Sequence, residues 1–265
     1  IMNAKYYGGC DIGSTTGKAV ILRGKEVVAS FILPREIDPE ETARLVLAET
    51  CSRAGLQGPG DLEYLVGTGY GRNEISFADE NVSEISCHAL GTHLCDPGIQ
   101  TIVDIGGQDM KGISLNEDGT VREFAMNDKC AAGTGRFFEA MSRIFRMELE
   151  EFAELPLGAR RPAAISAQCS VFAETEVISL LAKKSNPADI AAGIHLAVGK
   201  RCFTLLKRVG IRPSVTVTGG CAKNRGLISE LKKVLGAEIA PLPVDPQIVG
   251  ALGAAEFARR RAESR

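Results

Sequence analysis

DIGSTTGK at residues 11–18 and DIGGQD at residues 104–109 are two versions of one pattern. The first motif lies between two stretches with strand character, residues 6–12 and the run that ends at Val20. The second follows the apolar, β-branched residues 101–105 and leads into a further strand. A strand, an Asp-Ile-Gly turn and another strand therefore occur twice, which predicts an internal duplication.

Each turn has the composition of a phosphate-binding loop. Small residues let backbone N–H groups approach phosphate oxygens, and an aspartate at a strand end can reach Mg²⁺ through water. Asp11 and Asp104 are the expected strand-end carboxylates, and either Gln108 or Asp109 would orient the attacking water in a phosphoryl transfer. Lys18 either lies near the phosphates or points to solvent. The other loop residues expected near phosphate are Gly13, Ser14, Thr15, Thr16, Gly17, Gly106 and Gly107. The spacing differs from GxxxxGK[ST], which argues against a P-loop fold of the Walker type.

The rest of the chain is expected to be mostly helical. Apolar periodicity and flanking Gly and Pro residues predict helices at residues 39–54, 83–94, 135–146, 172–184, 188–209, 224–235 and 248–263, and short strands at 63–66 and 215–218. We expect a first domain at residues 1–100 and a second at 101–247. The C-terminal helix, residues 248–265, is expected to pack back on the first domain.

The composition excludes several classes of protein. The chain has 265 residues, 45% of them hydrophobic and 24% charged, which is typical of a globular protein. A net charge of -2 argues against nucleic-acid binding through bulk charge. No apolar run approaches the roughly 18 residues of a membrane span, and the N-terminal stretch lacks the apolar core of a secretory signal. Eight cysteines are too few for a disulfide scaffold, so we expect a cytoplasmic protein whose clustered thiols serve metal or redox chemistry.

Eight motifs distributed along essentially the whole chain together resemble one family. They are DIGSTTGK, TGYGR, SCHA, DIGGQD, NDKCAAGTGRF, CSVFAETEVIS, TGGCAKN and GALGAA. This set is similar to the activator components of 2-hydroxyacyl-CoA dehydratases, also called archerases, whose relatives include the ATPase subunits of benzoyl-CoA reductase. The two cysteine motifs are the most specific part of the resemblance.

The resemblance implies both a fold and an activity. The fold is α/β: a duplicated actin-like ATPase fold of the superfamily of acetate and sugar kinases, heat-shock chaperones and actin. The activity is an ATPase coupled to electron transfer, in a homodimer with one 4Fe–4S cluster at the subunit interface. With ATP and Mg²⁺ bound, the activator would transfer one low-potential electron to a partner 2-hydroxyacyl-CoA dehydratase. Reduced ferredoxin or flavodoxin would be the electron donor.

The resemblance also assigns individual residues. Cys130 and Cys169 would be the cluster ligands, while Gly219, Gly220 and Gln247 would lie on the adenosine side of the nucleotide. Each cysteine is expected a few residues before a helix, Cys130 before residues 135–146 and Cys169 before residues 172–184, where the helix dipole stabilises a thiolate. A 4Fe–4S cluster needs about four thiolates, so two cysteines from each of two copies would complete the set. Gln168 stands where relatives vary, and the proline-rich residues 241–246 weaken the assignment of Gln247.

Other interpretations stay open. The partner could be a benzoyl-CoA reductase or another iron–sulfur reductase, and the chain could instead be a small-molecule kinase or a redox or nucleotide sensor on the same fold. A zinc site formed by Cys87, His88, His93 and Cys95 is disfavoured, because adjacent residues rarely ligate one tetrahedral metal and no CxxC is present. Cys130 and Cys169 are the thiols to which the resemblance assigns a function.

Overall fold

The computed structural model describes residues 5–166 and 169–265, so Gln168 lies outside the described residues. The chain forms two compact units. Unit 1 comprises the described residues up to Ile99 together with Leu115–Arg122 and Leu242–Arg265; unit 2 comprises Gln100–Ser114 and Glu123–Pro241. In the described part of the chain, no helix has the length and apolar character needed to cross a bilayer.

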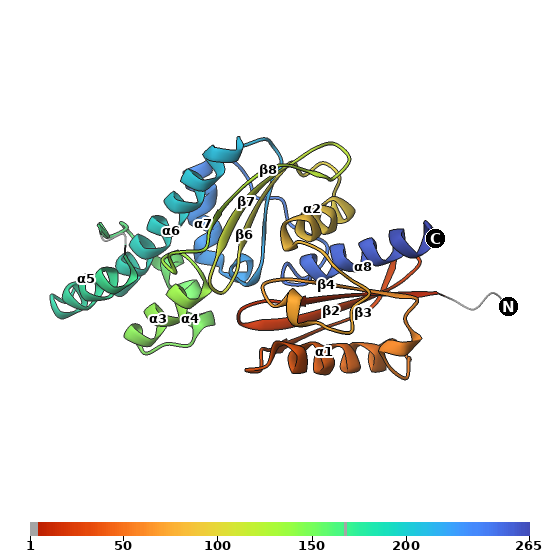
Figure 1. Ribbon diagram of the computed structural model, residues 1–265. Coiled ribbons are helices and arrows are strands. Elements are labelled where there is room, and N and C mark those ends of the chain that lie inside the picture. Colours follow the sequence, from red (N-terminus) through yellow and green to blue (C-terminus); the bar gives the residue numbers. More distant parts are fainter. Residues whose placement is uncertain (1–4, 167–168) are drawn as a thin grey trace. The chain divides into compact units, whose positions relative to one another are not determined.

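Unit 1 is built on a five-stranded sheet in the order β3-β2-β1-β4-β5 (Figure 1). Its strands are β1 (Tyr6–Ile12), β2 (Thr16–Arg23), β3 (Glu26–Pro34), β4 (Tyr64–Thr68) and β5 (Glu80–Asn81). The first three strands form an antiparallel meander, and β4 then adds to β1 in parallel. A parallel addition requires a crossover, which here contains helix α1 (Pro39–Arg53).

Helices cover both faces of this sheet, because successive strand residues point to opposite sides. Cys10, Ile12 and Ala19 pack with α1 in one buried cluster. Val20 and Leu22 belong to a second cluster that includes residues of α8 (Val249–Glu263). Helix α8 packs on β1, β2 and β4 and also against α2 (Glu84–Cys95).

Small residues let α8 approach its neighbours closely. A side chain at Gly9 would overlap the backbone of Ala251, and one at Gly253 would overlap the carbonyl oxygen of Cys87. The GALGAA motif therefore has a packing role: it brings the α8 backbone against both the sheet and α2.

Unit 2 repeats the sheet arrangement with four strands in the order β8-β7-β6-β9. They are β6 (Thr101–Ile105), β7 (Met110–Leu115), β8 (Val121–Asn127) and β9 (Val215–Thr218). β6 is antiparallel to β7 and parallel to β9, just as β1 is antiparallel to β2 and parallel to β4. The predicted duplication is confirmed by this shared topology.

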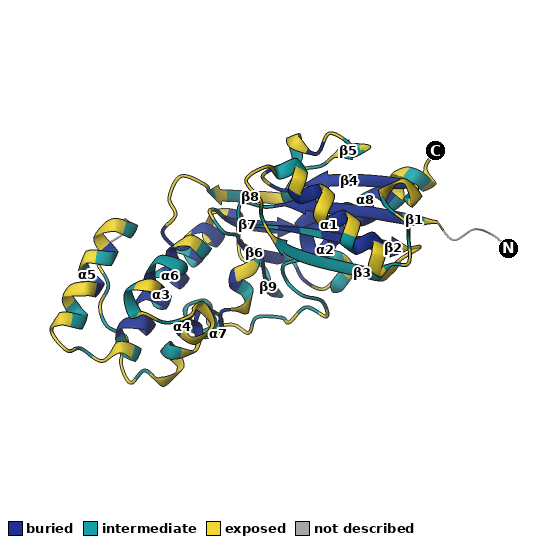
Figure 2. Ribbon diagram, turned by 90° about the horizontal axis from the view of Figure 1, so that it is seen from below, coloured by how far each residue is buried: buried dark blue, intermediate teal, exposed yellow. Residues whose placement is uncertain are grey.

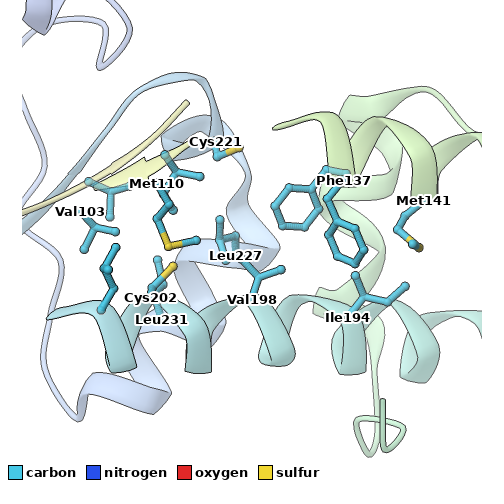
Figure 3. Close-up of a cluster of buried hydrophobic side chains, with 14 of the residues drawn as sticks. Val103, Met110, Phe137, Met141, Ile194, Val198, Cys202, Cys221, Leu227 and Leu231 are labelled. Carbon is cyan, nitrogen blue, oxygen red and sulfur yellow. The ribbon is translucent and has the colours of Figure 1, made fainter. Parts of the chain in front are cut away.

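The helices of unit 2 bury a large apolar cluster against the sheet. They are α3 (Gly135–Phe145), α4 (Leu149–Glu154), α5 (Ser170–Ala182), α6 (Pro187–Val209) and α7 (Arg225–Leu235). Four single turns of 3₁₀ helix complete the chain: η1 (Pro59–Asp61), η2 (Arg72–Glu74), η3 (Leu155–Gly158) and η4 (Gly220–Lys223). Figure 3 shows Val103 and Met110 of the sheet facing Val198 and Cys202 of α6.

Strand β8 differs from the sequence expectation, whereas helix α3 begins where it was expected. Strand β8 was not expected, because its exposed residues give no alternating apolar pattern. Helix α3 begins at Gly135, with Thr134 as its N-cap residue. This start agrees with the helix expected at residues 135–146, and four residues, Ala131–Thr134, separate Cys130 from α3. A hydrogen bond from Thr134 to the carbonyl of Ala131 closes a turn in this connection.

Candidate functional site

The first Asp-Ile-Gly loop is the tight connection of the β1–β2 hairpin. Asp11 on β1 lies directly opposite Lys18 on β2. The Lys18 ammonium lies 3.6 Å from the Asp11 carboxylate and donates a hydrogen bond of 3.3 Å to the carbonyl of Thr16. The backbone N–H of Gly13 also donates to Thr16, at 3.0 Å. Of the two positions considered for Lys18, the structure shows the one turned into the loop.

Three motifs of unit 1 converge on the Asp11 carboxylate. A side chain at Gly69, in TGYGR, would overlap this carboxylate. One at Gly250, in GALGAA, would have its Cβ 2.9 Å from Asp11 Oδ2 and 3.0 Å from His88 Nε2, in SCHA. Asp11 is 5% exposed. Because Gly69 and Gly250 have no side chains, there is room for the buried Asp11 carboxylate beside the first turn of α8. The positive end of the α8 dipole favours a negative charge there.

The second Asp-Ile-Gly loop connects β6 and β7 and has the same register. Asp104 lies opposite Lys111, which sequence reasoning did not identify. The Lys111 ammonium contacts Asp104 Oδ2 at 3.4 Å and Asp109 Oδ2 at 2.7 Å. A signal for Lys111 was present: in both motifs a lysine follows the first aspartate by seven positions, as Lys18 follows Asp11.

The two alternatives for water orientation differ in their surroundings. Gln108 is exposed at the tip of the loop. Asp109 is held from two sides, by Lys111 and by a backbone hydrogen bond of 3.0 Å from Gly106 to its carbonyl. Gly107 accepts a hydrogen bond from the backbone of Arg136, which ties the loop to the start of α3.

Gly219 and Gly220 follow β9 in unit 2, next to the second loop. Gly219 has a φ of +81°, and a Cβ there would lie 2.9 Å from Asp104 Oδ1. The loop continues as η4 and ends at Asn224, which caps α7 by accepting a hydrogen bond of 2.9 Å from the Leu227 N–H. Gln247 belongs to unit 1, where its N–H donates to Asp245.

Two of the eight cysteines are exposed, Cys130 and Cys169, and both belong to unit 2. Cys169 is the N-cap residue of α5. Burial raises the pKa of the other six thiols, to about 11 for Cys51 and Cys95 and about 12 for Cys87 and Cys202. It raises the pKa of Cys10 and Cys221 as well. These six remain protonated at neutral pH, and a metal ligand must be a thiolate.

The surroundings of the exposed pair suit an anionic ligand set. The Arg201 guanidinium lies near Cys130, and burial lowers the pKa of this guanidinium. Among the described residues, no three His, Cys, Asp or Glu side chains of one chain come together as a metal site. Two thiols are half of the about four thiolates that a 4Fe–4S cluster needs.

Helix α5 exposes apolar side chains next to Cys169. Val171, Phe172 and Ile178 are 66%, 69% and 54% exposed, whereas Ala173 and Val177 are buried. Figure 2 shows exposed residues along α5, alternating with intermediate and buried ones. Exposed apolar side chains gathered on one surface are typical of sites that bind a protein, a ligand or a membrane.

Comparison with known proteins identifies the family. Residues 9–258 match the model of the BadF/BadG/BcrA/BcrD ATPase family. The chain belongs to this family. It is 44% identical to the activator of lactoyl-CoA dehydratase from Anaerotignum propionicum, over 98% of this chain and 100% of that protein. It is also 44% identical to the (R)-2-hydroxyglutaryl-CoA dehydratase activating ATPase from Acidaminococcus fermentans, over 97% and 98% of the two chains.

Solved structures confirm the fold class. The activator of 2-hydroxyisocaproyl-CoA dehydratase from Clostridium difficile with bound ADPNP superposes with a TM-score of 0.92 at 42% identity, covering 98% of this chain and 96% of that one. A ROK family glucokinase from Streptomyces griseus matches at 12% identity with a TM-score of 0.60, over 96% and 99% of the chains, and shows the fold alone. This ATPase therefore has the actin-like fold shared with sugar kinases.

Proposed function

We propose that this chain is an ATP-dependent activator that passes one low-potential electron to a 2-hydroxyacyl-CoA dehydratase. One observation carries the proposal: a chain with two Asp-Ile-Gly hairpins exposes two of its thiols, whereas five others are buried and Cys95 is half-buried. The hairpins suit a nucleotide, and the exposed thiols suit a metal cluster. The relatives that are 44% identical are named as activators of such dehydratases, which supports the same partner class for this chain.

The two loops would bind the phosphates of ATP and ADP. The small residues from Gly13 to Gly17 and at Gly106 and Gly107 would let the backbone approach phosphate oxygens, with N–H donors other than those of Gly13 and Gly106, which bond within their own loops. Asp11 and Asp104 are carboxylates at strand ends and would act on Mg²⁺ through water. Gln108 or Asp109 would orient the water that attacks the terminal phosphate. Gly219, Gly220 and Gln247 would contact the adenosine side.

Cys130 and Cys169 would hold a 4Fe–4S cluster together with the same two cysteines of a second copy. Such a cluster supplies one-electron chemistry when bound. Cys169 at the N-cap of α5 places a thiolate where the helix dipole favours negative charge. The Arg201 guanidinium lies near Cys130, and its positive charge would attract an anionic cluster.

The exposed face of α5, formed by Val171, Phe172 and Ile178, would be covered by the second copy. This face begins at Val171, two residues after Cys169. The exposed apolar surface therefore adjoins a cysteine that would bind the shared cluster. Both requirements are met by one two-fold symmetric dimer, in which the same patch of each copy takes part.

The reaction balances with an external reductant. Reduced ferredoxin or flavodoxin would give one electron to the activator and be oxidised. The dehydratase would accept that electron, while ATP and water become ADP and phosphate. Hydrolysis can drive the transfer only if ATP binds one conformation of the dimer better than the other.

Anaerobic purification followed by iron and sulfide analysis tests the proposal. We expect about two irons per chain after reconstitution, because one 4Fe–4S cluster serves two chains. Cys130→Ser and Cys169→Ser should each lose the iron and keep nucleotide binding. Cys95→Ser, at the end of α2 in unit 1, is the matched control and should keep both.

Iron-free wild-type protein after reconstitution would overturn the proposal. ATP-dependent phosphorylation of a sugar or carboxylate that survives Cys130→Ala would identify a small-molecule kinase instead. A cluster that reduces a benzoyl-CoA reductase but no dehydratase would keep the electron-transfer chemistry and change the partner class.

A further inference from the structure

The two hairpins of the duplication carry the same cross-strand pair in the same register. Asp11 faces Lys18 across β1 and β2, and Asp104 faces Lys111 across β6 and β7. The surroundings of the two lysines nevertheless differ. The first hairpin holds one carboxylate near its lysine, whereas the second also places Asp109 there.

Lys18 is held loosely. Its ammonium is 3.6 Å from Asp11 and 3.3 Å from the Thr16 carbonyl, and its side chain is 11% exposed. Both distances are longer than the 2.7–2.9 Å of a strong charge-assisted hydrogen bond. Lys18 can therefore turn toward a phosphate without breaking a short ion pair.

Lys111 is held firmly. Its side chain is 4% exposed, and its ammonium lies between two carboxylates at 2.7 Å and 3.4 Å. Moving this ammonium to a ligand would leave two carboxylates close together with less compensating charge, which costs free energy. Its position therefore suits an anchor within the loop.

The contacts in this loop give the carboxylates of Asp104 and Asp109 different surroundings. Asp104 Oδ1 accepts a hydrogen bond of 2.9 Å from Thr218 on β9, Asp104 Oδ2 contacts Lys111, and the residue is 3% exposed. The Asp109 side chain is 19% exposed, and its Oδ2 receives the shorter contact from Lys111. Asp104 is thus anchored in the interior, while Asp109 is the carboxylate of this loop with more access to a ligand.

We propose that Lys111 is a positioning residue that fixes the Asp109 carboxylate in the second loop, and that it does not itself bind the nucleotide. The inference rests on the proposed ATPase function, since Asp109 is one of the two groups that would orient the attacking water. A carboxylate held at one oxygen by a buried ammonium keeps a single orientation for its other oxygen. The duplicated lysines therefore have different roles despite their equivalent places.

A double-mutant cycle with Lys111→Met and Asp109→Asn tests this inference. Steady-state ATP hydrolysis gives kcat, and titration with a fluorescent ATP analogue gives Kd. We expect Lys111→Met to lower kcat about tenfold to a hundredfold through loss of orientation, and to change Kd less than about threefold. In the Asp109→Asn background, Lys111→Met should change kcat less than about twofold, since its effect passes through Asp109.

Lys25→Met, in the exposed β2–β3 turn, removes the same charge and should behave as wild type. If Lys111→Met fails to fold by circular dichroism, the cycle is run with Lys111→Gln, whose amide still donates a hydrogen bond without carrying charge. Three results would overturn the inference. They are a wild-type kcat in a folded Lys111 variant, a Kd weakened by the same factor as kcat is lowered, and losses of kcat that simply multiply when the Lys111 and Asp109 substitutions are combined. Failure of the wild-type protein to bind or hydrolyse ATP would instead overturn the proposed function.

Discussion

Asn224 and His195 are joined by a buried hydrogen bond of 3.1 Å that ties the start of α7 to the middle of α6. The Asn224 amide N–H donates to His195 Nε2, and His195 Nδ1–H donates to the Ala191 carbonyl at 2.7 Å. The imidazole is fully buried and contacts the rings of Phe138 and Phe152. One residue therefore both ends the TGGCAKN loop and fixes it to the core of unit 2.

Asn224→Ala should destabilise the protein more than the loss of an ordinary helix cap. It removes the cap of α7, worth about 1 kcal/mol, and leaves His195 without a donor, which costs about 1–3 kcal/mol more. Urea unfolding measures the change. Ser83→Ala removes the more exposed cap of α2 and should cost only about 1 kcal/mol. Equal losses in the two variants would show that the contact with His195 contributes nothing to stability.

His195 should make stability fall as the solution becomes acidic. Burial lowers its pKa from 6.5 to about 4, so between these values the unfolded chain binds a proton that the folded chain does not. The contribution of the neutral imidazole is complete above pH 6.5 and is lost as the pH falls to about 4. This loss corresponds to about 3 kcal/mol of the free energy of unfolding. Urea midpoints measured from pH 7 to 4 should fall more steeply for wild type than for His195→Gln, and parallel curves would contradict this.

The fold could be predicted where the sequence has a repeated motif, or where Gly and Pro residues mark the end of a helix or strand. The two Asp-Ile-Gly motifs indicated the duplication, because a carboxylate at a strand end followed by small residues is recognisable locally. Strand β8 was missed, because an edge strand exposed on much of its surface has no apolar alternation.

The candidate site was predicted in part, for a similar reason. Glycines and aspartates of the loops are visible as motifs, whereas Lys111 became significant only through its contacts with Asp104 and Asp109. A lysine on a strand is usually assigned to a solvated face. Its burial depends on the hairpin register, and on β9 bringing Thr218 to the same carboxylate.

Gly253→Ala should destabilise unit 1 strongly although it adds a single methyl group. The added Cβ would overlap the carbonyl oxygen of Cys87, so α8 and α2 would have to separate. Overpacking of this kind costs about 1–3 kcal/mol, against a small gain from alanine's helix propensity. Thermal unfolding gives the change in Tm. Gly60→Ala, where no atom lies near the added group, should leave Tm almost unchanged, and an equally stable Gly253→Ala variant would contradict the close approach of these helices.

Lys18→Met should weaken nucleotide binding. A charge-assisted hydrogen bond contributes about 1.5–3 kcal/mol, which corresponds to a loss of about tenfold to a hundredfold in affinity. Isothermal titration with ADP and Mg²⁺ measures it, with Lys25→Met as the surface control. Unchanged affinity in a folded Lys18→Met variant would mean that Lys18 serves only to pair with Asp11.

Phe172→Glu should separate the two copies of the proposed dimer. Phe172 is 69% exposed on α5, three residues after Cys169, so a carboxylate there would place like charges together at a two-fold interface. Light scattering under anaerobic conditions should show monomers, and iron should be lost with the dimer because each chain supplies half of the thiolates. Phe124→Glu changes an exposed phenylalanine on β8 in the same way and should leave both the mass and the iron content unchanged. A Phe172→Glu variant that stays dimeric and retains its iron would place the interface elsewhere, and an iron-bearing monomer would show that one chain alone completes the ligand set.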